Sequence, residues 1–128
     1  MGKYGEVAIT ATRYFRTLPD LSPVDAWKLA VKISLPNSEA GQNKACPKGA
    51  FLGLCEEGIV KGVPIGQYTR SKKNKEYAIA AYHLLTEYQR LAANEEELWQ
   101  RVTERKGVRQ NQQMDVVLSL WKHDRLAR

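Results

Sequence analysis

Two cysteines, Cys46 and Cys55, carry the most distinctive chemistry in the chain, and they lie nine positions apart. A zinc knuckle places its paired cysteines only about two to four residues apart, so this spacing does not fit one. Only His83 and His123 could complete a metal site, and His83 falls on the polar face of a predicted helix with Glu87. The sequence therefore predicts no metal site, and nothing in it indicates a cofactor.

Cys46 has a setting that could make its thiol reactive. It stands at the cap position of a predicted helix, between Lys44 and Lys48, and a helix N-terminus and nearby cations both favour the thiolate form. No general base is close in sequence, and no second cysteine stands at Cys-x-x-Cys spacing. Two interpretations stay open: a nucleophile in a thiol-dependent enzyme, or a structural cap. Cys55 is expected in the core, so Cys46 should react faster with iodoacetamide.

The segment "KACPKGAFLGLCEEGIVKG" is rich in glycine, which raises the question of a phosphate-binding loop. Such a loop needs Gly-x-x-x-x-Gly-Lys-Ser/Thr after a strand, and this segment has neither the final hydroxyl residue nor a strand. Gly49 and Gly53 instead stand four residues apart on one face of the predicted helix. The absence of side chains there favours close approach of a neighbouring helix. The segment is therefore predicted to be a tightly packed central helix.

A basic cluster marks the start of the fourth predicted helix, in the segment "QYTRSKKNK". The helix dipole disfavours cations at this end, and a bound anion would relieve the repulsion with free backbone amides and lysines together. An aromatic residue beside the cluster could stack on a base or simply pack. We therefore predict an anion-binding site for nucleic acid or an acidic protein surface; a solvated loop is the alternative. Lys72, Lys73 and Lys75 are expected to be exposed, so their replacement by Gln should barely affect stability. The site comprises Tyr68, Arg70, Lys72, Lys73 and Lys75.

The last two predicted helices have the lengths of a helix-turn-helix, but their residue types fit it poorly. Asp115 would face DNA phosphates, and the preceding helix begins with three glutamates. An ordinary helical hairpin is favoured. Val116 and Leu120 form an apolar surplus on the last helix, so a protein–protein adaptor or small oligomer that uses this surface is an alternative function.

Residues for acid–base catalysis are few. Glu56 and Glu57 are adjacent, so they point to different faces of a helix and cannot flank one bond. No Ser-His-Asp arrangement is apparent. The sequence therefore favours a non-catalytic binding or accessory module, with an enzyme at Cys46 as the remaining alternative.

Six helices account for most of the chain, because apolar residues recur with a helical period and no segment alternates as a strand would. Ser22 and Asn94 are predicted N-caps, and residues 58–69 are predicted to form an ordered loop with tight turns. The chain is predicted to be a single all-α domain, 1–128, folded as an orthogonal bundle. The helices are expected at about 4–18, 22–35, 46–58, 72–91, 94–107 and from 111 onward.

Composition places the chain among ordinary globular proteins. It has 128 residues, of which 43% are hydrophobic and 27% charged, with a formal net charge of +6. No apolar run is long enough to cross a bilayer, and the N-terminus lacks the apolar core of a signal peptide. With only two cysteines, a cytoplasmic location is expected. The basic excess suits an anionic partner, although charge for solubility is an equally simple reading.

Three segments resemble a family of short bacterial proteins of unknown function: "CPKGAFLGLCEEG", "YTRSKKNKEYA" and "QMDVVLSLW". The resemblance covers nearly the whole chain. It implies a bacterial, stand-alone protein of one domain. It supplies no catalytic or binding residues, because the family has no assigned activity.

Overall fold

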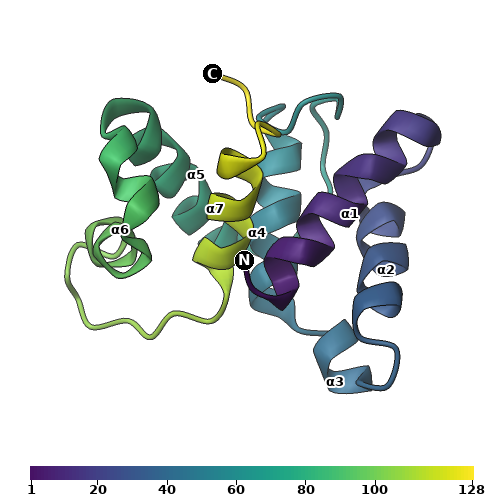
Figure 1. The fold of residues 1–128 in the computed structure, drawn as a ribbon, viewed down its shortest axis with the longest axis horizontal. Helices are drawn as coiled ribbons and strands as arrows, with labels where there is room; N and C mark the ends of the chain where they lie inside the picture. The colour runs from purple at the N-terminus through teal and green to yellow at the C-terminus, as the bar shows by residue number, and fades with distance from the viewer.

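Six helices of eight or more residues make up most of the computed structural model, which describes all residues from 1 to 128 (Figure 1). A one-turn helix and a 3₁₀ turn link some of them. The only strand-like pairing is a single antiparallel bridge between Val60 and Leu126. The predicted all-α class is confirmed. The elements are α1 (Lys3–Thr17), α2 (Pro23–Ser34), α3 (Glu39–Gln42), α4 (Ala45–Glu56), α5 (Lys72–Glu87), η1 (Gln89–Ala93), α6 (Glu95–Val102) and α7 (Gln113–Lys122).

Two predicted N-caps are present. The Ser22 hydroxyl accepts a hydrogen bond from the Asp25 amide at 3.1 Å, and the Asn94 side-chain oxygen accepts one from the Glu97 amide at 3.0 Å. Each cap satisfies an amide that has no partner inside its own helix. These local signals therefore set where α2 and α6 begin.

The start of α4 differs from the prediction. The helix begins at Ala45, with Lys44 at the cap position, so Cys46 lies inside the first turn and does not cap it. Pro47 is tolerated anywhere in a first helical turn, because no amide hydrogen bond is needed there. Pro47 therefore indicates that a helix starts in this segment, but it does not indicate which residue is the first.

Two predicted helices end earlier than expected. The helix predicted to reach Leu91 stops at Glu87 and continues as the 3₁₀ turn η1. α6 ends at Val102 rather than near Gly107, because the chain enters a left-handed turn just beyond it.

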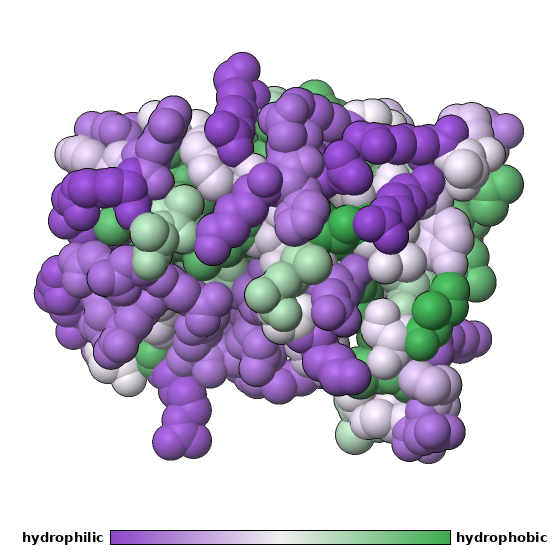
Figure 2. Space-filling model, in the orientation of Figure 1, coloured by the Kyte–Doolittle hydropathy of each residue, from purple (hydrophilic) through white to green (hydrophobic).

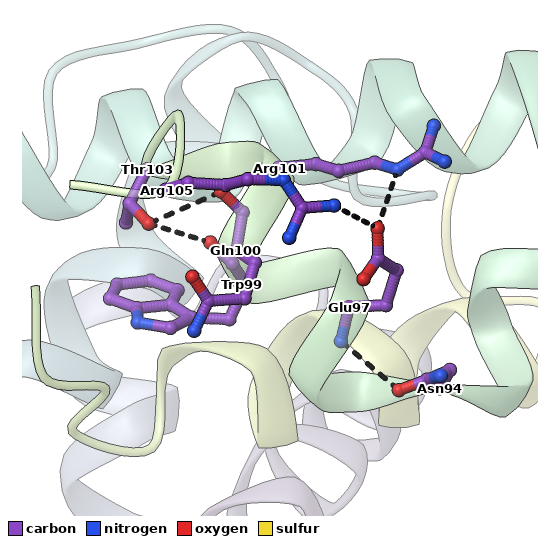
Figure 3. A network of polar contacts seen from close by, with 7 residues as sticks. All are labelled: Asn94, Glu97, Trp99, Gln100, Arg101, Thr103 and Arg105. Atoms are coloured by element: carbon purple, nitrogen blue, oxygen red, sulfur yellow. Dashed lines mark hydrogen bonds and ion pairs between the residues drawn. The ribbon is translucent and has the colours of Figure 1, made fainter. Parts of the chain in front are cut away.

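The left-handed turn after α6 is accompanied by a charge network (Figure 3). Arg105 has a φ of 56°. The Glu97 carboxylate accepts hydrogen bonds from Arg101 at 3.1 Å and from Arg105 at 2.6 Å. Both arginines are thus paired within the acidic part of the chain, and neither belongs to a free basic surface.

α7 lies in the middle of the molecule (Figure 1), where it packs against α1, α4, α5 and α6. Its residues from Gln113 to Trp121 are all buried. Val116 and Leu120 are 0% exposed, so the prediction of an apolar docking surface on this helix is wrong. The apolar surplus reflects a helix that is covered on every side.

Asp115 is buried and joins α7 to the start of α1. Its carboxylate accepts hydrogen bonds from the amides of Gly2 and Gly5, each at 2.8 Å. An acidic group is favourable at a helix N-terminus, so this side chain acts as a cap supplied from the far end of the sequence. Asp115 therefore does not face a DNA phosphate, and residues 103–112 separate α6 from α7 in place of the short turn of a helix-turn-helix.

α4 and α5 pack at glycine, as the segment around Cys46 and Cys55 predicted. A Cβ atom built on Gly53 would lie 2.7 Å from the Lys75 Cα atom, and one built on Gly49 would lie 2.9 Å from the Asn74 Cβ atom. Both distances are too short for side-chain atoms. The two glycines are therefore required for the close approach that positions the start of α5.

Hydrophilic side chains cover most of the face shown in Figure 2, and apolar residues appear there in small separate groups. The exposed apolar residues include Leu29 and Ile33, which are one turn apart on α2 and are 42% and 62% exposed. No helix is both long enough and apolar enough to cross a membrane.

Candidate anion-binding site at the start of helix α5

Glu56, the last residue of α4, organises the loop that leads into α5. One carboxylate oxygen accepts hydrogen bonds from the amides of Tyr68 at 2.7 Å and Thr69 at 2.8 Å. The other accepts one from the Lys75 ammonium at 2.8 Å. The Glu56 side chain is only 8% exposed, and its hydrogen bonds tie α4, the loop and α5 together.

Burial alone would raise the pKa of Glu56. The hydrogen bonds from Lys75 and from the Thr69 and Tyr68 amides outweigh burial, so this pKa lies below its usual value. The hydrogen bond to Glu56 in turn raises the pKa of Lys75, although burial opposes the shift. Both partners are therefore charged near neutral pH.

Lys75 is thus engaged inside the protein. Its ammonium also lies 3.6 Å from the Glu57 carboxylate, and its side chain is 27% exposed. The expectation that this lysine is a free surface cation is wrong. The anion nearest to it is a carboxylate of the same chain, and no local pattern indicates this pairing because the partners are nineteen positions apart.

Tyr68 also has an internal role. Its hydroxyl donates a hydrogen bond to the Pro64 carbonyl at 2.7 Å, and its ring lies so close to Gly66 that a Cβ atom there would be 2.7 Å from the ring. The half-buried ring packs within its own loop, which corresponds to the simple-packing alternative rather than to stacking on a base.

Three further cations lie near the start of α5. The Lys73 ammonium lies over the Tyr77 ring, 5.5 Å from its centre. Arg70 and Lys72 are exposed, and neither forms an ion pair or a side-chain hydrogen bond. Arg70 and Lys72, but not Lys73, line an open pocket of about 400 Å³ together with Glu57 and the ion pair of Glu56 and Lys75, and no hydrophobic residue lines it. Two of the four predicted cations therefore remain available to a ligand.

The start of α5 is held in place by side chains rather than closed by a cap. The Ser71 hydroxyl accepts a hydrogen bond from the Asn74 side chain at 2.8 Å, so it does not cap an amide of its own helix. The Asn74 oxygen accepts a bond from Gln113 of α7 at 3.1 Å. The helix start is therefore fixed against the central helix and keeps its positive end towards the pocket.

The two cysteines are separate and unpaired. Cys46 is half-buried, and the only polar side chain on its sulfur is the Asn111 amide, at 3.7 Å. Cys55 is fully buried, and burial, together with the charge of Glu56, raises the pKa of its thiol well above the usual value. Neither thiol is hydrogen-bonded to an imidazole or a carboxylate that could act as a general base.

The histidines also stand apart. His83 is exposed, and the His123 ring nitrogen lies 2.9 Å from the Ser119 carbonyl oxygen. No three His, Cys, Asp or Glu side chains lie together in the way that metal ligands would.

These features define a small all-helical protein with an open polar pocket at the start of α5, in which an internal ion pair lies beside two unpaired cations. The chain belongs to DUF6979, a family of unknown function whose model matches residues 1–127. The resemblance found in three motifs is confirmed at the level of the family. No curated protein and no solved structure matches the chain.

Proposed function

We propose that this protein is a non-catalytic binding module that holds the phosphate backbone of a nucleic acid at the start of α5, through Arg70 and Lys72. The observation that carries the proposal is that Arg70 and Lys72 are exposed and form no ion pair beside a helix start that no side chain caps. Helix N-termini and basic side chains together are suited to phosphate groups.

The ion pair of Glu56 and Lys75 supports this function indirectly. It fixes the loop on both sides of Arg70, because Glu56 accepts the Thr69 amide before it and the Lys75 ammonium after it. A cation on a fixed backbone loses less conformational entropy when it binds than one on a mobile loop. In this proposal Glu56 and Lys75 position the site, while Arg70 and Lys72 contact the ligand.

The lining of the pocket favours a nucleic acid over an acidic protein. Protein–protein interfaces have an apolar or aromatic centre, whereas this pocket contains no hydrophobic residue. Contacts to phosphates, by contrast, need only cations, amides and hydroxyls.

We also propose a bacterial, cytoplasmic setting, which fits the two unpaired cysteines.

Fluorescence anisotropy with a labelled random oligonucleotide tests the proposal. The double variant R70Q/K72Q should bind more weakly than the wild type. K28Q/K32Q removes two exposed lysines from α2 and should retain most of the affinity, because it changes net charge equally without touching the pocket. Equal losses in both variants would mean that binding reflects net charge alone and would contradict the proposed site.

Polyglutamate provides the comparison with an acidic protein surface. If it displaces the oligonucleotide only weakly, the nucleic-acid proposal is supported. Binding of polyglutamate by the wild type, lost in R70Q/K72Q, with no binding of the oligonucleotide would replace the nucleic acid by an acidic protein as partner.

A protein–protein adaptor remains the second candidate, on a different surface from the one predicted. Leu29 and Ile33 are exposed on α2 beside Lys28 and Lys32. An apolar contact there would persist at high salt, whereas phosphate contacts would weaken. Sedimentation of the wild type and of I33S at high salt distinguishes the two: salt-resistant association lost in I33S would support the adaptor.

A further inference from the structure

A second basic pocket forms where three remote parts of the chain meet. It is lined by Thr12, Phe15 and Arg16 from α1, Lys61 and Gly62 from the segment after α4, and Arg125 from the C-terminal segment. Its volume is about 300 Å³, and no acidic residue lines it. It shares no residue with the pocket at the start of α5.

The backbone on either side of this pocket is firmly held. The amide of Lys61 donates to the Arg125 carbonyl at 2.9 Å, and the amide of Ala127 donates to the Ile59 carbonyl at 2.8 Å. Between these bonds, Val60 and Leu126 are 1% and 0% exposed. The C-terminal segment is thus anchored by hydrogen bonds and by core packing on both sides of Arg125.

The Arg125 side chain is held as well. Its Nε donates to the Thr12 hydroxyl at 3.1 Å, and its Nη1 donates to the His123 carbonyl at 3.3 Å. Thr12 is itself fixed, because its hydroxyl donates to the Ile9 carbonyl at 2.7 Å. Nη2 of Arg125 has no partner in the protein. A guanidinium held in this way presents its remaining donor at little entropic cost.

The surrounding charges are almost all positive. Arg13 and Arg16, on the same part of α1, form no ion pair. Asp124, the one acidic neighbour of Arg125, is engaged by Lys61 at 2.9 Å and by Arg128 at 3.9 Å. Burial, and then the charges of Arg16 and Arg13, lower the pKa of Arg125. The arginines therefore repel one another in the absence of an anion.

We infer that Arg16 and Arg125, with Arg13 and Lys61 beside them, form a binding pocket for a phosphate group. Guanidinium groups bind phosphate through paired, charge-assisted hydrogen bonds, and an anion here would relieve the repulsion among the arginines. Three of the six residues that line the pocket are cationic and only one is hydrophobic, which suits a phosphate or diphosphate group better than an entire nucleotide. The inference does not rest on the proposed function, since it concerns different residues.

Isothermal titration calorimetry of the full chain with inorganic phosphate and pyrophosphate tests the inference, with chloride adjusted to keep ionic strength constant. We expect saturable binding that is tighter for pyrophosphate. R13Q/R16Q should weaken it by about tenfold or more, because the charge-assisted hydrogen bonds of Arg16 and the positive charge of Arg13 beside the pocket are lost. R90Q/R109Q removes two arginines that do not line the pocket and should leave the affinity unchanged.

Thr12→Val gives an independent readout, because it removes the hydroxyl that positions Arg125 without changing any charge. It should weaken pyrophosphate binding while the far-ultraviolet circular dichroism stays unchanged. No saturable binding by the wild type, or equal losses in R13Q/R16Q and R90Q/R109Q, would overturn the inference.

The source of the phosphate group can be identified in the same assay. If an oligonucleotide without terminal phosphates displaces pyrophosphate from the wild type, the pocket binds a nucleic-acid backbone. If only molecules with a free phosphate group displace it, the ligand is a phosphomonoester or phosphate itself. Because R70Q/K72Q leaves this pocket intact, failure of the α5 site and failure of this pocket are distinguishable.

Discussion

At the scale of single residues, the most consequential side chain is Glu56. It accepts two loop amides and the Lys75 ammonium while it is almost fully buried. A buried carboxylate is stable only when its oxygens are satisfied, and removal of the carboxylate would leave its three donors without this acceptor. The loop before α5 therefore depends on this one carboxylate.

Glu56→Gln should lower the free energy of unfolding by about 1–3 kcal/mol, because the neutral amide cannot pair with the Lys75 charge and offers one acceptor fewer. Denaturant unfolding measures this difference. Glu57→Gln is the matched control on an exposed neighbour, 49% exposed, and should change stability by less than about 0.5 kcal/mol. Equal effects in the two variants would show that Glu56 does not organise the loop.

The loss in Glu56→Gln should also depend on pH. Because the pKa of Glu56 is lowered by folding, its contribution is fully present above its unfolded value of about 4.3 and is lost as pH falls through the folded value. Folding raises the pKa of Lys75, so the pH dependence runs the other way. The contribution of Lys75 to stability is fully present below its unfolded pKa of about 10.4 and is lost as pH rises through the folded value. The difference between wild type and variant should therefore be constant near neutral pH and shrink in acid. A difference that persists in acid would exclude the ion pair as its cause.

Cys46 should react with iodoacetamide faster than Cys55 in the folded protein. Cys46 is half-buried at the start of α4, whereas Cys55 is fully buried and burial raises the pKa of its thiol. Peptide mass spectrometry after timed alkylation gives both rates, and the rates should converge in denaturant. Equal rates without denaturant would mean that the core around Cys55 opens readily.

At the scale of elements, the contact between α4 and α5 determines where the candidate site lies. Glycine at two positions of α4 lets α5 approach so closely that the Lys75 ammonium can reach Glu56. Packing and the ion pair are therefore parts of one arrangement.

Gly53→Leu should lower the melting temperature, because the added side chain would overlap the Lys75 backbone and force the helices apart; overpacking costs about 1–3 kcal/mol. Ala45→Leu adds apolar volume at an exposed position of the same helix and serves as the control. Thermal unfolding followed by circular dichroism makes the comparison. A melting temperature unchanged by Gly53→Leu would contradict the close packing.

Sequence patterns predicted the elements well where the signal was local. Ser22 and Asn94 cap the helices they were expected to cap, and the Gly49–Gly53 spacing indicated a close helix contact. Patterns failed where distant parts of the chain decide the outcome. Val116 and Leu120 looked like a surplus because the helices covering α7 come from elsewhere in the chain.

At the scale of the whole molecule, several of the basic residues are not free surface cations. Arg101, Arg105 and Lys75 each pair with a carboxylate of the chain, which a count of charges cannot reveal. Composition predicted a basic protein but not where its free charges lie. The cluster around Arg125 escaped prediction for the same reason: its bond to Thr12 joins positions that are 113 residues apart.

The salt dependence of oligonucleotide binding tests the central claim, that free cations at the start of α5 hold a phosphate backbone. For a single-stranded oligonucleotide, the logarithm of the binding constant should fall with the logarithm of salt concentration by about 0.7 for each phosphate engaged. R70Q/K72Q should make this slope shallower by about 1.4, because two phosphate contacts are lost. K28Q/K32Q should leave the slope unchanged. A slope unaltered by R70Q/K72Q, or no binding by the wild type at low salt, would contradict the account.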